Sequence, residues 1–302
     1  MRGVLTIGFV LAIGCGTQPR DRVEKVESVP VSQAAMALPT VLTRVSTQAP
    51  LLNPRDIDSP ITGRRGIFAI GDPCAFYHDE EELWRVFWSA NDVYAEEMGL
   101  NEIGMMGAVS SNGIEFTTLS FLPMTQVGNF DTGSMETCDV IKVGTGADRL
   151  YYMFYSASAL TPDEVTGEEF TTWRVGLAIS QDGFRFEALP ASLSSAGTEG
   201  LLFDSTDILG KSMRKGNFVT DPVVSFARGK FHMWTLCVQQ LPDARGGVCY
   251  HTSYDAINWH HHGVVKGLDR AFPIQPTVFF NPATKNFEMY VVMDTPQEEQ
   301  AV

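Results

Sequence analysis

The sequence is poor in basic residues and in long helical patterns. Its 22 lysine and arginine residues face 36 aspartate and glutamate residues, for a formal net charge of −14. Nucleic-acid binding draws on a clustered surplus of lysine and arginine, so we expect no nucleic-acid partner. The sequence also has no G-x-S-x-G nucleophile elbow, no phosphate-binding P-loop and no dinucleotide-binding glycine fingerprint. We therefore expect neutral or cationic partners and no cofactor.

Length allows one large domain or two modest ones, and composition favours many short strands. The 302 residues and the 44% hydrophobic content allow a sizeable core. The 27 glycines, 16 prolines and 11% aromatic residues fit short strands joined by tight turns, because glycine adopts positive φ and aromatic rings suit a half-buried pleated surface. We expect an all-β protein.

The N-terminus has the layout of an export signal. One arginine precedes an apolar run from Val4 to Ile13, which is too short to span a membrane as a helix. We expect residues 1–14 to be a signal peptide, so that the chain is exported. Residues 15–45 mix charge with proline, serine and glutamine without sustained periodicity, so we expect a flexible tether there, ahead of a domain over 46–302.

The residues around Cys15 resemble the lipobox of bacterial lipoproteins. Small or aliphatic residues precede the cysteine, although the leucine, Leu11, lies four places before it rather than three. The resemblance implies a lipid on Cys15 that anchors the chain to the bacterial outer membrane or cell envelope. The alternative is an ordinary cleaved signal peptide, followed by a cysteine that is there by coincidence.

Four further cysteines, an even number, fit disulfides in an oxidising compartment, and three pairings are open: Cys74, Cys138, Cys237 and Cys249. Cys237 and Cys249 flank a segment rich in turn residues, so we favour a bridge between them across a hairpin over two free thiols. No C-x-x-C spacing indicates zinc. The adjacent histidines at 260–262 would point to alternate faces of a strand without a carboxylate cluster beside them, so we expect no metal site.

A repeated unit organises the chain from about residue 50 onward. Each unit opens with a polar residue ahead of a short strand, and a strand with alternating aromatic residues follows about ten to thirteen residues later. The opening residues are Asp72, Asp139, Asp221 and Gln275. Several short strands in each unit, repeated along the chain, indicate sheets arranged as the blades of a β-propeller. Four blades are recognisable, and the last has only two strands.

A recurring heptapeptide follows the third strand in the first three units. The copies are SSNGIEF at 110–116, SQDGFRF at 180–186 and SYDAINW at 253–259. Asp-Gly and Asn-Gly pairs tolerate positive φ in tight turns, and the preceding serine can bond to the loop backbone. We expect each copy to form the turn between a third and a fourth strand, with its final aromatic residue packed between neighbouring blades.

The blades resemble the five-bladed propellers of glycoside hydrolases: the arabinanases and β-xylosidases of family 43, their fructosidase relatives and the mannoside phosphorylases. The likeness spans about residues 50–302 and rests on an Asp-Pro strand, the strand YYMFYSAS at 151–158, and VGLAISQDGFRF at 175–186. It implies a carbohydrate substrate or ligand. With four recognisable units, we expect a propeller that is incomplete at the C-terminus or closed by N-terminal strands.

In the resembled hydrolases the first strand of each blade lines the central axis and supplies a carboxylate. Carried over by motif position, Asp72 would be the base or nucleophile, Asp139 would orient substrate and tune pKa values, and Asp221 would take the acid's place, where the family has glutamate. Glycoside cleavage needs such a pair of an acid and a carboxylate. The alternative is that aspartate before proline only ends a turn. Glu136 is either a second candidate acid or a solvated loop residue.

Four further side chains are candidates for contact with a sugar. Trp88, Tyr155 and Trp234 offer aromatic faces suited to the CH groups of a sugar ring, and Gln275 opens the fourth unit. The alternative place for the aromatic residues is the blade core. Two main functions follow: hydrolysis of a poly- or oligosaccharide by the axial carboxylates, or binding of a glycan or protein without catalysis. A structural protein of the cell envelope is a third.

Overall fold

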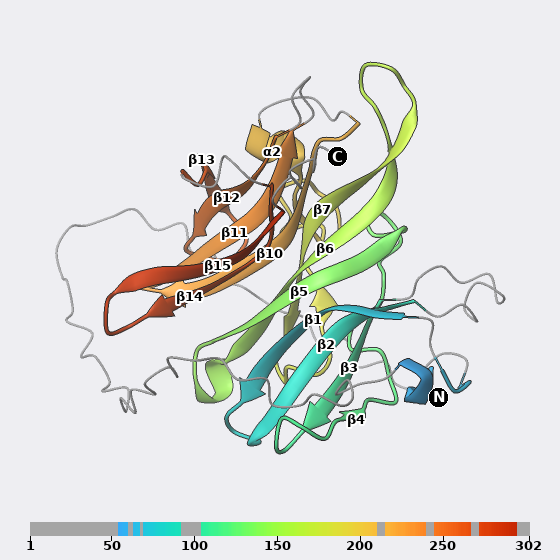
Figure 1. Cartoon of the computed structure of the whole chain (residues 1–302), viewed down its shortest axis with the longest axis vertical. Helices are drawn as coiled ribbons and strands as arrows, with labels where there is room; N and C mark the ends of the chain where they lie inside the picture. Colours follow the sequence, from blue (N-terminus) through green and yellow to red (C-terminus); the bar gives the residue numbers. More distant parts are fainter. Residues whose placement is uncertain are drawn as a thin grey trace, which may run out of the picture. The chain divides into compact units, whose positions relative to one another are not determined.

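The computed structural model shows a nearly all-β protein (Figure 1). The chain divides into two units, Met1–Thr47 and Gln48–Val302, and the residues that the structure describes all belong to the second. They are 54–59, 63–66, 69–91, 104–209, 215–239, 245–266 and 272–294. The expected signal peptide, the tether and Cys15 lie outside the described residues.

The described strands form four antiparallel sheets in sequence order. The first contains β1 (Ala69–His78), β2 (Leu83–Asn91), β3 (Met105–Ser110) and β4 (Thr117–Thr118). The second contains β5 (Ser134–Val143), β6 (Leu150–Pro162), β7 (Glu169–Ser180) and β8 (Glu187–Ala188), with β9 (Leu201–Phe203) paired to β7. The third contains β10 (Phe218–Ala227), β11 (Lys230–Gln239), β12 (Arg245–Ser253) and β13 (Trp259–Val264). The fourth contains β14 (Phe272–Asn281) and β15 (Asn286–Asp294).

Helical segments are short: η1 (Pro54–Asp56), η2 (Gly146–Asp148) and α2 (Ser205–Leu209). Within the described ranges, no helix has the length and apolar character needed to cross a membrane. The sheets therefore carry the architecture, as the composition predicts.

Each sheet is a meander whose first strand adjoins the first strand of the next sheet. β1 packs on β5, β5 on β10, and β10 on β14. Figure 1 shows β1, β5 and β10 following one another across the sheets. This is the order of propeller blades, in which the first strands surround a common axis. The predicted propeller fold is confirmed, with two strands in the fourth sheet.

Three of the four apolar cores among the described residues lie between neighbouring sheets. The core between the first two sheets includes Phe87 and Phe186, whose rings meet edge to face at 5.6 Å. The next core holds Phe154 with Trp259 packed against it, in the same arrangement at 5.8 Å. A third core, between the third and fourth sheets, contains Trp234. Phe186 and Trp259, the final aromatic residues of two copies of the heptapeptide, thus pack between blades, as predicted. Phe116, which ends the first copy, instead packs with Ile57 against residues of the first sheet, so the prediction is wrong for that copy.

All three copies of the heptapeptide form the same kind of turn. In the second copy, Ser180 Oγ accepts hydrogen bonds from the backbone N–H groups of Asp182 and Gly183, at 3.2 and 2.8 Å, and Asp182 Oδ1 accepts two more from residues further on. The copies at 110–116 and 253–259 make corresponding side-chain bonds. Each copy connects a third strand to a fourth, which confirms the prediction.

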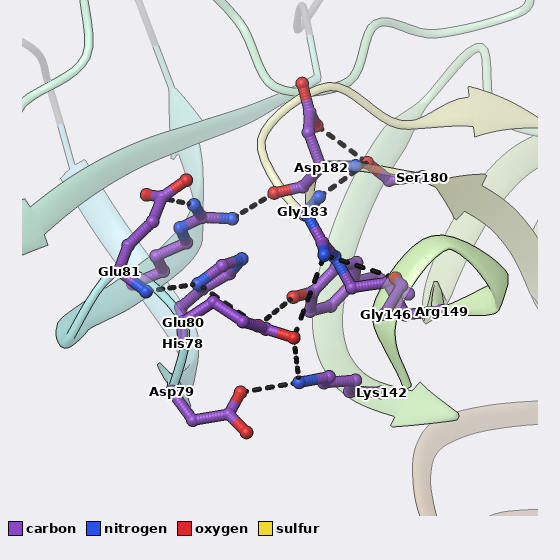
Figure 2. Close-up of polar contacts among 12 residues, drawn as sticks. His78, Asp79, Glu80, Glu81, Lys142, Gly146, Arg149, Ser180, Asp182 and Gly183 are labelled. Carbon is purple, nitrogen blue, oxygen red and sulfur yellow. Dashed lines mark hydrogen bonds and ion pairs between the residues drawn. The ribbon is translucent and has the colours of Figure 1, made fainter. Parts of the chain in front are cut away.

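Polar side chains tie the β1–β2 hairpin to the second sheet (Figure 2). Lys142 of β5 lies 2.7 Å from Glu80 at the tip of the hairpin. Arg85 of β2 is fully buried, pairs with Glu81 at 2.6 Å and donates to the backbone carbonyl oxygen of Asp182 in the heptapeptide turn. The charged run at the hairpin tip is therefore partnered across the blade boundary, because the second sheet presents cations to it.

Candidate functional site

Each first strand carries a β-bulge close to the residue that opens its repeat. The pairing shifts occur between Gly71 and Cys74, Glu136 and Cys138, Thr220 and Val223, and Ile274 and Thr277. In β1, β10 and β14 the bulge contains a proline directly after the opening residue. Proline has no N–H group to donate to the strand ladder, so an X-Pro step at this point favours a bulge.

The bulges place Asp72 and Asp221 at equivalent positions and Asp139 at a different one. Asp72 and Asp221 have positive φ angles of 49° and 53°, and the residue of β5 with positive φ is Thr137, at 31°. Asp139 comes two residues after Thr137 and is paired with Phe154, beyond the bulge of β5. The predicted equivalence of the three aspartates is therefore wrong, because β5 lacks the Asp-Pro pair and forms its bulge two residues before Asp139.

Asp221 is nearly enclosed at the bulge of β10. The residue is 8% exposed. Thr220 Oγ1 lies 3.1 Å from Asp221 Oδ1, within donating distance, and the backbone N–H of Asp221 donates to Ser156 Oγ at 2.8 Å. Ser156 belongs to β6, so the second sheet helps to hold the strained backbone of the third sheet in place.

The negative charges of two other carboxylates contribute to the raised pKa of Asp221. Burial is the largest cause and raises the pKa of Asp221, because a charge is less stable away from water. Hydrogen bonds from the side chains of Thr220 and Thr137 oppose this rise, and the negative charges of Asp72 and Glu136 add to it. One carboxylate from each of the first three sheets therefore interacts near the bulges. We call Asp72, Glu136 and Asp221 the bulge carboxylates.

Glu136 takes the place in this group that the sequence motif assigned to Asp139. It is a partly buried residue of β5, paired with Ser156 of β6, and directly precedes Thr137. It is therefore a strand residue and not a solvated loop residue. The sequence METCD contains both acids but no proline, so nothing local to it shows which one lies at the bulge.

Asp139 connects the second sheet to the third. Its Oδ2 accepts a hydrogen bond from the backbone N–H of Val224 in β10, at 2.6 Å. Burial raises the pKa of Asp139 to about 6, against the opposing effect of hydrogen bonds from the backbone N–H groups of Val224 and Val140. Its carboxylate is thus used in a contact between blades.

The predicted sugar-stacking aromatic residues lie in the blade cores. Trp88 is 1% exposed, Tyr155 0% and Trp234 5%. Trp88 and Tyr155 have no free ring face, so the alternative of a core position describes them, and their stacking role is not supported. Trp234 lines a cavity of about 360 Å³ together with apolar side chains of β14 and β15. Gln275 lies in the bulge of β14, and its side chain is outside the described residues.

Histidines gather on the third sheet. His251 Nδ1 lies 2.8 Å from His261 Nδ1, and His251 Nε2 lies 2.9 Å from Thr235 Oγ1. Burial lowers the pKa of both histidines, and neighbouring histidines lower it further. In the part of the chain that the structure describes, no group of three or more His, Cys, Asp or Glu side chains is arranged to hold a metal ion.

Two disulfides link the four cysteines of the described residues. Cys237 of β11 is bonded to Cys249 of β12 within the third sheet, the pairing favoured from the sequence. Cys74 of β1 is bonded to Cys138 of β5 and joins the first sheet to the second, with the Cα atoms 5.4 Å apart. This second bridge adjoins the bulges of β1 and β5 and therefore lies beside the bulge carboxylates.

Comparison with known proteins shows the fold. No protein-family model matches this chain, and no curated protein matches it. A solved structure described as a glycoside hydrolase is similar, with a TM-score of 0.51 and 15% identity over 83% of this chain and 75% of the other. Sucrose-6-phosphate hydrolase from Lactobacillus gasseri is similar, with a TM-score of 0.53 and 14% identity over 83% of this chain and 46% of the other. The chain thus has the β-propeller fold found in glycoside hydrolases, as the sequence resemblance predicts.

Proposed function

We propose that this protein hydrolyses glycosidic bonds of a poly- or oligosaccharide at the bulge carboxylates. The observation that carries the proposal is the interaction of carboxylates from three sheets, in which burial and neighbouring charge raise the pKa of Asp221. Glycoside cleavage needs one carboxylic acid that keeps its proton and one ionised carboxylate. The fold shared with a glycoside hydrolase and a sucrose-6-phosphate hydrolase supports this reaction class.

In this proposal Asp221 donates the proton to the leaving glycosidic oxygen. Its raised pKa keeps the carboxyl protonated to higher pH than an ordinary aspartate. Asp72, at the equivalent bulge of β1, activates water as a base or attacks the sugar as a nucleophile. Glu136 contributes negative charge that favours the protonated form of Asp221. The anomeric configuration of the first product distinguishes the two roles of Asp72, since direct attack retains it and attack by water inverts it.

Hydrolysis assays on p-nitrophenyl arabinofuranosides and xylosides and on a panel of polysaccharides test the proposal. Asp72→Asn and Asp221→Asn are each expected to lower kcat by about a hundredfold or more, because each removes a proton-transfer or nucleophilic group. Asp139→Asn is the control: it changes another acid of a first strand and keeps activity of the wild-type order. Failure of the wild type to release product from any substrate contradicts hydrolysis.

A second candidate function is binding of a glycan or protein without cleavage. Aspartate in the acid's place favours it, since the side chain is shorter than glutamate and Asp221 is only 8% exposed. Calorimetry with oligosaccharides separates the two functions. Binding that Asp72→Asn weakens, in a protein without hydrolytic activity, supports the binding function, and the absence of both binding and hydrolysis contradicts both functions.

We also propose that the protein is exported and anchored by a lipid on Cys15. The apolar run before Cys15 supports this, and the two disulfides fit an oxidising compartment. Cells expressing the full chain with labelled palmitate should yield a labelled wild type and an unlabelled Cys15→Ser variant. An unlabelled wild type contradicts the anchor.

A further inference from the structure

We propose that the disulfide between Cys74 and Cys138 positions the carboxylates of the first two sheets, so that the site keeps its geometry only while this bridge is intact. The consequence for catalysis rests on the proposed function, whereas the spacing of the carboxylates does not.

The disulfide joins β1 and β5 close to the residues that carry the two carboxylates. Cys74 is the first residue paired after the bulge of β1, and Cys138 is the first residue paired after the bulge of β5. Asp72 and Glu136 each lie two residues before the cysteine of their strand. Two residues of extended chain span at most about 7 Å, so a short path of covalent bonds connects the two acidic residues.

Hydrogen bonds hold Asp221 of the third sheet against the second sheet. Ser156 Oγ accepts from the backbone N–H of Asp221 at 2.8 Å and lies 2.9 Å from the hydroxyl oxygen of Thr220. Ser156 is the register partner of Glu136 in the second sheet. The second sheet is therefore the common reference: polar contacts place Asp221 against it, and the disulfide places Asp72 against it.

The bridge is also part of a packed boundary between blades. Cys74 and Cys138 are each 7% exposed and belong to the core that contains Phe87 and Tyr155. Removing the bridge affects stability as well as spacing, because the linked residues are 64 apart in the sequence. A test of positioning therefore needs a measurement that a loss of stability alone does not change.

The test compares two double variants of the full chain, Cys74→Ser with Cys138→Ser and Cys237→Ser with Cys249→Ser. Each loses one disulfide, and the second is the matched control because its bridge lies within one sheet. Circular dichroism reports folding, and carbon-13 NMR of the aspartate carboxyls reports the pKa of Asp221. We expect this pKa to fall in the first variant, because the negative charges of Asp72 and Glu136 move away from Asp221 and Asp221 becomes less buried. In the control we expect it to stay at the wild-type value.

A folded first variant whose Asp221 titrates as in the wild type overturns the proposal. If that variant does not fold, the wild type is reduced under native conditions with a dithiol, which gives two electrons and two protons to the protein disulfide and becomes a disulfide itself. The pKa of Asp221 should then fall and recover on reoxidation, and an unchanged pKa after reduction of Cys74–Cys138 overturns the proposal. A shifted pKa in a protein without hydrolytic activity supports positioning and contradicts the proposed function, so the two failures are distinguishable.

Discussion

Asp139 and Asp221 both lie on first strands, and burial raises the pKa of each, yet their partners differ. Asp139 accepts a backbone hydrogen bond from Val224 in the next sheet. Asp221 is influenced by the charges of Asp72 and Glu136, which come from two other sheets. A raised pKa at a residue identifies a candidate acid only together with its partners, since contacts between blades also bury carboxylates.

Asp139→Asn should show this difference as a pH-dependent change in stability. The folded pKa of about 6 lies above the ordinary value of 3.8, so the folded protein binds this proton more tightly, and the carboxyl reduces stability as pH rises from about 4 to 6. Asparagine is uncharged and still accepts the bond from Val224. At pH 7 the variant should be as stable as the wild type or more stable by up to about 3 kcal/mol, and this difference should vanish near pH 4. Urea unfolding at both pH values measures it, and a variant less stable than the wild type at pH 7 contradicts the expectation.

The turns after the third strands of the second and third sheets have different residues at a position of positive φ. Gly183 and Ala256 occupy it in the second and third sheets, and both have a φ of 67°. A Cβ atom on Gly183 would come 2.7 Å from Arg85 Nη1, whereas the methyl group of Ala256 is buried in the core between the second and third sheets. The same backbone turn therefore demands glycine in one blade and accepts alanine in another.

Gly183→Ala should destabilise the protein by about 1–3 kcal/mol, because positive φ strains alanine and Arg85 must move. Ala256→Gly relieves the same strain but removes a buried methyl group, and each effect is worth about 1 kcal/mol. Because the two effects oppose each other, the free energy of unfolding of this variant should stay within about 1 kcal/mol of the wild-type value. Urea unfolding of both variants at pH 7 measures the contrast. Equal losses of stability in the two would show that Arg85 does not constrain the turn.

The third sheet should make the protein sensitive to mild acid. Burial lowers the pKa of His251 below its ordinary 6.5, and His261 lowers it further. The unfolded chain then binds a proton more readily, so the stability from this group is present above about pH 6.5 and is lost as pH falls. His251→Gln should reduce the fall in unfolding free energy between pH 7 and 5.5 by about 1 kcal/mol. An identical fall in both proteins contradicts the expectation.

Across the whole molecule, the sequence predicts what is local and misses what depends on register between blades. Period-two strands and Asp-Gly turns are set by neighbouring residues, so the four sheets and their turns were predictable. The sequence left Glu136 open as a candidate acid or a solvated loop residue, because only the pairing of β5 with β6 shows that the bulge falls beside it. The link from Cys74 to Cys138 and the burial of Trp88 depend on which surfaces meet, which a single sequence with three open cysteine pairings does not determine.

The second sheet unites the proposed site, since it contacts the first sheet through a disulfide and the third through Ser156 and Asp139. The pKa of Asp221, measured by carboxyl NMR titration in three variants, tests most directly whether carboxylates from three sheets form one site. Asp72→Asn and Glu136→Gln should each lower this pKa, because each removes a neighbouring negative charge, and Asp139→Asn should leave it unchanged. An Asp221 that titrates identically in the wild type, Asp72→Asn and Glu136→Gln would contradict the account.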